Sequence, residues 1–179
     1  MSSRWAVVLL LGVAGCTRGG NAPEQANASA DAPAAPAAGI DRSHRGETLP
    51  AAQLVDVDGK PATLPAGKPL VVNLWATWCA PCVAELPTLD RAAGTLAGRV
   101  AVVALDQGDG ADKVQAFLAG KPLAHVRPLI DRQLEVSVRL GANLPTTILY
   151  GADGRERWRV TGGRDWASAE SLKLLGEAG

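Results

Sequence analysis

An apolar run that leads directly into two closely spaced cysteines constrains this chain more than any other feature. Residues 70–76 read LVVNLWA, and Cys79 and Cys82 follow as Trp78-Cys79-Ala80-Pro81-Cys82, at the start of a stretch with helical spacing. A near-continuous apolar run is typical of a strand that is buried on both faces. A strand that turns into a helix here places both thiols at the helix N-terminus, where they can form and break a disulfide without moving the backbone.

The helix N-terminus gives the two thiols different expected roles. Unpaired backbone N–H groups and the positive end of the helix dipole favour a thiolate at Cys79. The pKa of a free cysteine, about 8.5, is lowered in such places, so we expect Cys79 to be the nucleophile. Cys82 lies one helical turn later on nearly the same face and can resolve a mixed disulfide on Cys79. Pro81 is tolerated because first-turn N–H groups have no intrahelical partner.

Two cysteines at this spacing can also bind a metal, attach a haem or form a structural disulfide. A zinc site needs about four ligands, and His44 and His125 are not at paired-ligand spacing. Attachment of a c-type haem is excluded because Val83, and not histidine, follows Cys82. A purely structural disulfide would close too short a loop to remove much chain entropy. Metal binding and a structural disulfide stay open as alternatives, but we expect no metal and no cofactor beyond the redox-active disulfide itself.

Residues 1–15 have the pattern of an export signal. Arg4 supplies a positive charge, residues 5–13 are apolar, and Val13-Ala14-Gly15-Cys16 follows. The apolar stretch is shorter than the roughly 20 residues that a spanning helix needs. The order aliphatic, small, small, cysteine resembles a bacterial lipobox, which implies cleavage of the signal and lipidation of Cys16; ordinary signal cleavage is the alternative. Several acyl chains at Cys16 would anchor the protein stably to a membrane.

Composition divides the rest of the chain into a linker and one domain. Residues 16–44 are mostly Ala, Pro, Asn, Ser and Gly, which cannot bury enough apolar surface to fold, so we interpret them as a flexible linker. Residues 45–179 have the length of one ordinary domain. The formal net charge is zero, which gives no reason to expect nucleic-acid binding.

Hydrophobic periodicity predicts alternating strands and helices in this domain. The segments are a hairpin of residues 52–57 and 60–64 about Asp58-Gly59, strands 70–76 and 100–105, helices 80–96, 113–119 and 133–140, a hairpin of residues 144–150 and 155–160, and a helix 166–177. We expect Pro87 to kink the first helix. Strand–helix–strand–helix order implies parallel pairing and an α/β fold.

Several motifs resemble the thioredoxin fold, specifically its TlpA/ResA-like extracytoplasmic branch. In order they are Asp58-Gly59-Lys60-Pro61, residues 73–82 (NLWATWCAPC), Glu85 with Pro87, and Leu144-Pro145-Thr146-Thr147. The resemblance covers roughly residues 48–175. It implies a thioredoxin-like α/β fold with a central mixed sheet, helices on its faces and an added N-terminal β-hairpin.

The resemblance also implies a substrate-binding surface. The proline that matches Pro145 is cis in this family and lies beside the dithiol, so that Leu144 can offer its backbone N–H and C=O to an extended partner peptide. An ordinary trans proline is the alternative reading. Trp78 is expected to cover the cysteines and shape this surface together with Ala80 and Pro81, whereas Trp75 is expected in the core.

Asn73 and Glu85 mark a departure from thioredoxin itself. Thioredoxin has an acid where Asn73 stands, and asparagine cannot accept the proton of the resolving cysteine. Glu85 follows Cys82 by three residues and matches a glutamate that the TlpA/ResA-like branch uses near its dithiol. We expect Glu85 to accept the Cys82 proton, with a pKa raised by partial burial; a solvated helix carboxylate is the alternative.

The remaining polar candidates have simpler readings. Asp106 ends a predicted strand, where functional groups often lie, but a cap is the more ordinary role. His125 is expected to be structural or exposed. Arg155, Arg157 and Arg159 are expected on the solvated face of an edge strand.

These observations predict an extracytoplasmic thiol-disulfide oxidoreductase. Ala80-Pro81 between the cysteines stabilises a thiolate less than a histidine would, which favours a reductase. The resemblance implies protein dithiols and disulfides as substrates, such as apocytochrome c or copper-chaperone cysteines, and a membrane thiol-disulfide electron donor. A thiol oxidase or isomerase and a non-catalytic module that binds a metal or partner are the alternatives. We expect the protein in the bacterial periplasm, anchored by its lipid to a membrane. Thr17 after Cys16 favours the outer membrane over the inner membrane as the site of this anchor.

Overall fold

The computed structural model describes residues 39–178. The expected signal, residues 1–15, the expected lipidation site Cys16 and residues 17–38 of the expected linker lie outside the described residues. In the described part of the chain, none of the helices combines the length and the apolar character needed to cross a membrane.

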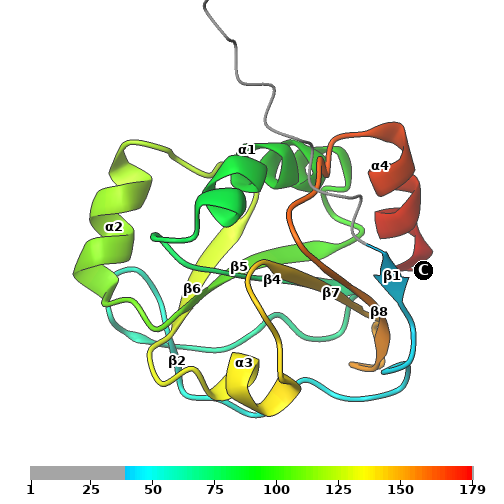
Figure 1. Ribbon diagram of the computed structural model, residues 1–179, viewed down its shortest axis with the longest axis horizontal. Helices are drawn as coiled ribbons and strands as arrows, with labels where there is room; N and C mark the ends of the chain where they lie inside the picture. The colour runs from blue at the N-terminus through cyan, green and yellow to red at the C-terminus, as the bar shows by residue number, and fades with distance from the viewer. Residues whose placement is uncertain (1–38, 179) are drawn as a thin grey trace, which may run out of the picture. The chain divides into compact units, whose positions relative to one another are not determined.

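One mixed sheet of eight strands forms the centre of this part of the chain (Figure 1). Its strands lie in the order β1-β8-β7-β4-β5-β6-β2-β3. Their bounds are β1 Ile40–Asp41, β2 Leu54–Val55, β3 Pro61–Ala62, β4 Leu70–Trp75, β5 Ala101–Gln107, β6 Arg127–Asp131, β7 Thr146–Tyr150 and β8 Glu156–Thr161. β4, β5 and β6 are parallel, and the other pairs are antiparallel. The expected α/β architecture is confirmed, including the added hairpin β2–β3 at one edge.

Helices cover both faces of the sheet. Their bounds are α1 Ala80–Thr95, α2 Ala111–Ala119, α3 Glu135–Leu140 and α4 Ala169–Leu175, and a 3-10 turn follows at Gly176–Ala178. Residues of α1, α2 and α4 belong to one buried cluster, and Val136 of α3 belongs to the cluster on the other face (Figure 1). α1 continues through Pro87.

The central strand β4 carries the chain into the cysteine motif. All six of its residues are buried, because β5 and β7 pair with its two edges and a hydrophobic cluster covers each face. Val71 and Trp75 face the cluster that contains α1, whereas Val72 and Leu74 face the other. The sequence prediction of a doubly buried strand is thus confirmed, and its end is fixed against the sheet.

Two strands were not predicted. β6 begins Arg127-Pro128, so its apolar part is too short for a clear pattern; its Leu129 and Ile130 are nevertheless fully buried beside β5. β1 has one apolar residue, Ile40, and is identified only by its pairing with β8. The sheet therefore begins before residue 45, where the domain boundary was expected.

The prediction for the arginines of β8 was wrong in part. β8 is not an edge strand, because β1 pairs with it. A bulge opposite Leu149 and Tyr150 brings Glu156 and Arg159 to the same side. There Arg159 is buried and its guanidinium makes two hydrogen bonds to the Glu156 carboxylate, at 2.8 and 2.7 Å.

The last helix begins later than expected. Its first turn is capped by Ser168, whose side-chain oxygen accepts a hydrogen bond from the backbone N–H of Ser171. Trp166, predicted as the first helical residue, instead lies in the connection between β8 and α4 and is fully buried.

Candidate active site

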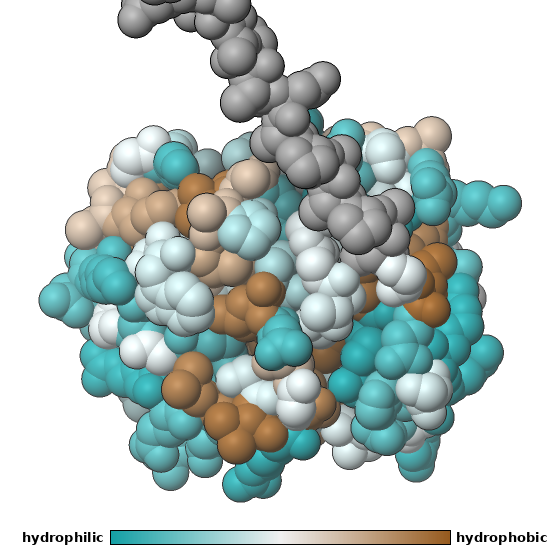
Figure 2. Space-filling model, viewed as in Figure 1, coloured by the Kyte–Doolittle hydropathy of each residue, from teal (hydrophilic) through white to brown (hydrophobic). Residues whose placement is uncertain are grey.

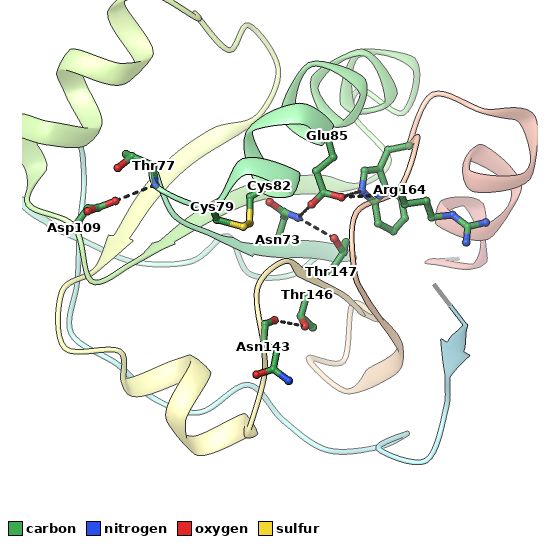
Figure 3. Close-up of a disulfide and its surroundings, with 11 residues drawn as sticks. Asn73, Thr77, Cys79, Cys82, Glu85, Asp109, Asn143, Thr146, Thr147 and Arg164 are labelled. Atoms are coloured by element: carbon green, nitrogen blue, oxygen red, sulfur yellow. Dashed lines mark hydrogen bonds between the residues drawn. A yellow bond between two sulfur atoms is a disulfide. The ribbon is translucent and has the colours of Figure 1, made fainter. Parts of the chain in front are cut away.

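Cys79 and Cys82 are joined in a disulfide between the end of β4 and the start of α1 (Figure 3). Their Cα atoms are 5.3 Å apart. Cys79 is the N-cap residue of α1, and its backbone carbonyl accepts a hydrogen bond from Val83 at 3.0 Å. Cys79 is 6% exposed, whereas Cys82 is fully buried. A partner disulfide can therefore approach Cys79 more readily than Cys82.

The first turn of α1 is favourable for an anionic sulfur at Cys79. The turn contains no acidic residue, and Pro81 lies within it. The remaining backbone N–H groups at this end carry the positive end of the helix dipole. This arrangement is the one that we expected to favour the Cys79 thiolate after reduction.

The peptide bond between Leu144 and Pro145 is cis, as the family resemblance implied. The segment is held from both sides: the Pro145 carbonyl accepts a hydrogen bond from Gly162 N–H at 2.8 Å, and the Asn143 carbonyl accepts one from the Thr146 hydroxyl at 2.6 Å (Figure 3). Pro145 is buried and Leu144 is half-buried. Leu144 thus lies at the surface of a fixed loop.

Glu85 is buried on α1, one turn after Cys82. Its Oε1 accepts a hydrogen bond from Asn73 Nδ2 at 2.7 Å. Its Oε2 accepts hydrogen bonds from Arg164 N at 3.0 Å and from Trp166 Nε1 at 3.2 Å. Burial raises the pKa of Glu85 to about 7, against the lowering effect of these three donors. Glu85 is therefore not the solvated carboxylate of the alternative reading, and it can gain or lose a proton near neutral pH.

Asn73 connects β4 to both α1 and β7. Its Nδ2 also donates to Thr147 Oγ1 at 2.9 Å, while its Oδ1 is buried without a hydrogen-bond partner. Figure 3 shows the Asn73 amide between the disulfide and Glu85, with the nitrogen toward Glu85. The position where thioredoxin has an acid is thus occupied by a neutral amide bonded to an acid on the neighbouring helix.

A second acidic group lies on the other side of the cysteine loop. Asp109 Oδ2 accepts a hydrogen bond from Thr77 N–H at 3.0 Å, and Lys113 Nζ donates to Asp109 Oδ1 at 2.6 Å (Figure 3). Asp106, considered as a possible cap, accepts the backbone N–H of Asp109 at 2.9 Å, and burial raises its pKa to about 7. Asp109 was not predicted as a site residue, because its position in a short Gly-rich turn gives no periodic signal. It fixes the loop before Cys79 through its hydrogen bond from Thr77.

The aromatic residues near the cysteines have the expected division. Trp75 is fully buried, with its ring centroid 5.4 Å from that of Phe117. Trp78 is 66% exposed and Ala80 and Pro81 are exposed beside it. On the side turned to the viewer, Figure 2 shows apolar areas that are separated by polar side chains. The exposed Trp78 can contact a partner.

A groove of about 310 Å³ lies beside the motif. It is bordered by Pro81, Ala84, Glu85 and Thr88 of α1 and by residues 163–165 of the β8–α4 connection. Gly163 approaches α1 closely, since a Cβ atom there would lie 3.5 Å from Pro81 Cβ. The connection after β8 therefore contacts the cysteine helix and, through Gly162, the cis-proline loop.

One other candidate, His125, makes no described hydrogen bond to this centre. His125 is exposed, and its backbone N–H donates to Asp90. Within residues 39–178, no three or more His, Cys, Asp or Glu side chains are grouped in a way that could hold a metal ion.

Comparison with known proteins gives a consistent family. The sequence profile described as Redoxin matches residues 44–172. The chain is 32% identical over 144 residues to the thiol:disulfide interchange protein DsbE of Vibrio cholerae, an alignment that covers 74% of this chain and 77% of that protein. It is also 32% identical over 122 residues to the thiol-disulfide oxidoreductase ResA of Geobacillus thermodenitrificans, covering 65% of this chain and 69% of the relative.

Solved structures show the same fold. A putative thiol:disulfide interchange protein DsbE from Chlorobium tepidum superposes with a TM-score of 0.66 at 23% identity, covering 75% of this chain and 98% of that chain. A putative thiol-disulfide oxidoreductase from Bacteroides vulgatus gives a TM-score of 0.62 at 20% identity, covering 75% and 96%. With its paired cysteines at the helix N-terminus, the chain belongs to the Redoxin family and is a thiol:disulfide oxidoreductase of thioredoxin-like fold.

Proposed function

We propose that this protein reduces disulfides of other proteins outside the cytoplasm, with Cys79 as nucleophile, Cys82 as resolving thiol and Glu85 as the acceptor of the Cys82 proton. The observation that carries the proposal is the buried Glu85 carboxylate, one turn after Cys82, with a pKa of about 7. A proton acceptor works best when its pKa lies near the working pH.

Two exchange steps account for the reaction. First, the Cys79 thiolate attacks a client disulfide: the Cys79–client S–S bond forms, the client S–S bond breaks, and one client sulfur leaves as a thiolate. Then the Cys82 S–H proton passes to Glu85, and the Cys82 thiolate attacks Cys79 Sγ and expels the second client thiolate. Two electrons reach the client, the Cys79–Cys82 disulfide forms, and an external dithiol must reduce it again.

Client binding would use the surface around the cis proline. Leu144 would offer its backbone to an extended client segment, as in strand addition, and Pro145 would present no donor or ligand to the sulfurs. Trp78, Ala80 and Pro81 are exposed beside Cys79 and would contact the residues that flank the client cysteine.

The direction of electron flow follows from the residues between the cysteines. Ala80-Pro81 adds no cationic side chain to stabilise the Cys79 thiolate, and a less stable thiolate gives a more reducing couple. We infer a membrane thiol-disulfide donor and clients such as apocytochrome c or metallochaperone cysteines. We also propose a periplasmic location with a lipid anchor at Cys16 and with the outer membrane favoured by Thr17.

Reduction of insulin disulfides tests the catalytic roles. Cys79→Ser should fall to the background rate. Glu85→Gln should slow turnover by about 10²-fold at pH 7, the usual scale for loss of a proton acceptor. Unchanged turnover in Glu85→Gln would remove Glu85 from the mechanism, retained activity in Cys79→Ser would remove Cys79 as the nucleophile, and no insulin reduction by the parent protein would support a non-catalytic module.

The reduction potential tests the direction. Equilibration of the Cys79–Cys82 pair against a glutathione buffer should give a value more reducing than about −180 mV, the potential of protein disulfide isomerase. A value near −120 mV, typical of a strong thiol oxidant, would overturn the reductase assignment. Mixed disulfides trapped by Cys82→Ala in the intact cell would then identify the clients.

A further inference from the structure

The side-chain amide of Asn73 forms hydrogen bonds through its nitrogen but not through its oxygen. It is fully buried, and its Nδ2 donates to Glu85 Oε1 and to Thr147 Oγ1. Its Oδ1 has no hydrogen-bond partner. A buried carbonyl oxygen without a donor costs free energy, so an unused oxygen this close to a reactive pair calls for a physical reason.

The orientation of the amide follows from its neighbours. In its ionised form Glu85 only accepts hydrogen bonds, so the end of Asn73 that meets this form is the nitrogen. The oxygen is then the opposite end, and Figure 3 shows it on the side of the amide toward Cys82. The disulfide sulfur carries no proton, so this oxygen has nothing to accept in the oxidised protein.

Reduction changes what faces the oxygen. When the Cys79–Cys82 bond is broken by two electrons and two protons, Cys82 gains an S–H group, a weak donor in a site without water exposure. A buried oxygen acceptor that is directed to the side of Cys82 can accept a hydrogen bond from this S–H group without any rearrangement of β4.

We propose that Asn73 is the positioning residue of the resolving step: its Oδ1 accepts the S–H of reduced Cys82, while its Nδ2 holds the Glu85 carboxylate that receives the proton. This inference rests on the proposed role of Glu85. In the step itself the Cys82 S–H bond breaks, an O–H bond forms on Glu85, the Cys82 electron pair forms the bond to Cys79 Sγ, and the client leaves as a thiolate.

The groups that surround Glu85 make this assignment specific. Glu85 follows Cys82 by one turn on α1 and accepts hydrogen bonds from Asn73 on β4 and from Arg164 and Trp166 in the β8–α4 connection. Thr88 and Asp165 border the same groove, and Thr147 on β7 is bonded to Asn73. The Arg164 side chain is directed to Ser171 and Glu170, and exposed Asp165 accepts the backbone N–H of Ala167. The hydrogen bonds that lower the proton affinity of Glu85 come from neutral donors, of which only Asn73 also has an unused acceptor.

The infrared S–H stretching band of Cys82 tests the hydrogen bond directly. In a Cys16→Ser, Cys79→Ser protein, Cys82 is the sole thiol, since the chain has three cysteines. The band should lie at the lower frequency of a hydrogen-bonded thiol. Adding Asn73→Leu should return it to the frequency of an unbonded thiol, whereas Asn73→Asp, which keeps an oxygen at the same place, should leave it low.

The rate of resolution tests the functional part. Cys79 in a reduced Cys16→Ser protein is labelled with dithiobis-nitrobenzoate, and release of thionitrobenzoate by Cys82 is followed by stopped flow between pH 5 and 9. Asn73→Leu should resolve roughly tenfold more slowly at pH 7, with its profile displaced upward by about one pH unit, because Glu85 loses a donor and binds its own proton more tightly.

Thr147→Val is the matched control. It removes the other acceptor of the same Asn73 amide, so it weakens any purely structural link between β4 and β7 but leaves Oδ1 and Glu85 in place. Its profile should match that of the parent protein. An unchanged S–H band in Asn73→Leu, or an equal displacement in Thr147→Val, would overturn the role of Asn73. If Glu85→Gln itself leaves the profile unchanged, it is the proposed function that fails, while the S–H band still reports on Asn73 alone.

Discussion

Opposing effects set the proton affinity of Glu85. Burial is the larger effect and raises its pKa from an ordinary value of 4.5 to about 7, while hydrogen bonds from Asn73, Arg164 and Trp166 act to lower it. A carboxylate with an ordinary pKa is a weak base for a thiol, whereas one with a pKa of about 7 can gain and lose a proton at neutral pH. The three donors limit the shift that burial causes.

This balance predicts how the stability of the oxidised protein depends on pH. Between pH 4.5 and 7 the folded chain binds more protons at Glu85 than the unfolded chain does, so the free energy of unfolding falls as the pH rises through this window. Urea unfolding at pH 5 and pH 8 should show a loss that is smaller in Glu85→Gln by on the order of 2 kcal/mol. Asp106, whose pKa burial also raises to about 7, contributes in the same direction in both proteins and cancels in the difference. An identical loss in both proteins would mean that Glu85 ionises normally in the folded state.

The connection between β8 and α4 is the element that joins the parts of the candidate site. It bonds to the cis-proline loop through Gly162, packs against Pro81 through Gly163, and donates to Glu85 from Arg164 and Trp166. Trp166 N–H also donates to Thr88 Oγ1 at 3.1 Å. A segment about eighty residues after Glu85 thereby supplies two of the hydrogen bonds that Glu85 accepts.

Two stacked indoles in this region provide a matched pair of substitutions. Trp158 and Trp166 are both fully buried, with ring centroids 6.3 Å apart, but Trp166 Nε1 donates to Glu85 whereas Trp158 Nε1 has no partner. Trp166→Phe should raise the pKa of Glu85 further and displace the pH profile of resolution upward by about half to one unit. Trp158→Phe should lose similar packing with no displacement. The thionitrobenzoate release assay measures both, and equal profiles would show that the Trp166 N–H does not matter.

At the scale of the whole described region, one edge of the sheet is formed by β1, a strand that was not predicted from the sequence. β1 pairs with β8 through Ile40 and Asp41, and Arg42 next to it forms an exposed ion pair with Glu177 near the C-terminus at 2.8 Å. Exposed pairs of this kind stabilise little. The main effect of β1 is to satisfy backbone groups of β8 and to keep β8 from being an open edge.

Truncation tests this role of β1. A chain that begins at residue 45 should be less stable to urea than one that begins at residue 39, by about 1–2 kcal/mol, and more prone to associate. Insulin reduction per folded molecule should be equal, because the residues of the candidate site lie between 73 and 166 and none contacts β1 in the hydrogen bonds described. Equal unfolding free energies would place the start of the domain at residue 45 after all.

Local features of the sequence determined the strand–cysteine–helix unit of residues 70–95 and both hairpins. In each case the signal lies within a few consecutive residues, such as an apolar run or an Asp-Gly turn. The cis form of Pro145 was expected only from the family resemblance, and the structure has it. The prediction that Glu85 is buried with a raised pKa also held, because three residues of spacing on a helix fix its side relative to Cys82. These features depend on chain neighbours, which the sequence displays directly.

Only the tertiary structure decided which partners these groups have. It placed Asn73, Arg164 and Trp166 around Glu85 and buried Arg159 against Glu156, where an open edge had been expected. It also paired β1 and β6 into the sheet, although neither has a clear pattern. Hydrogen bonds and burial depend on which atoms are close in space and not on their order in the chain. The proton affinity of a buried acid therefore depends on segments that are far away along the chain.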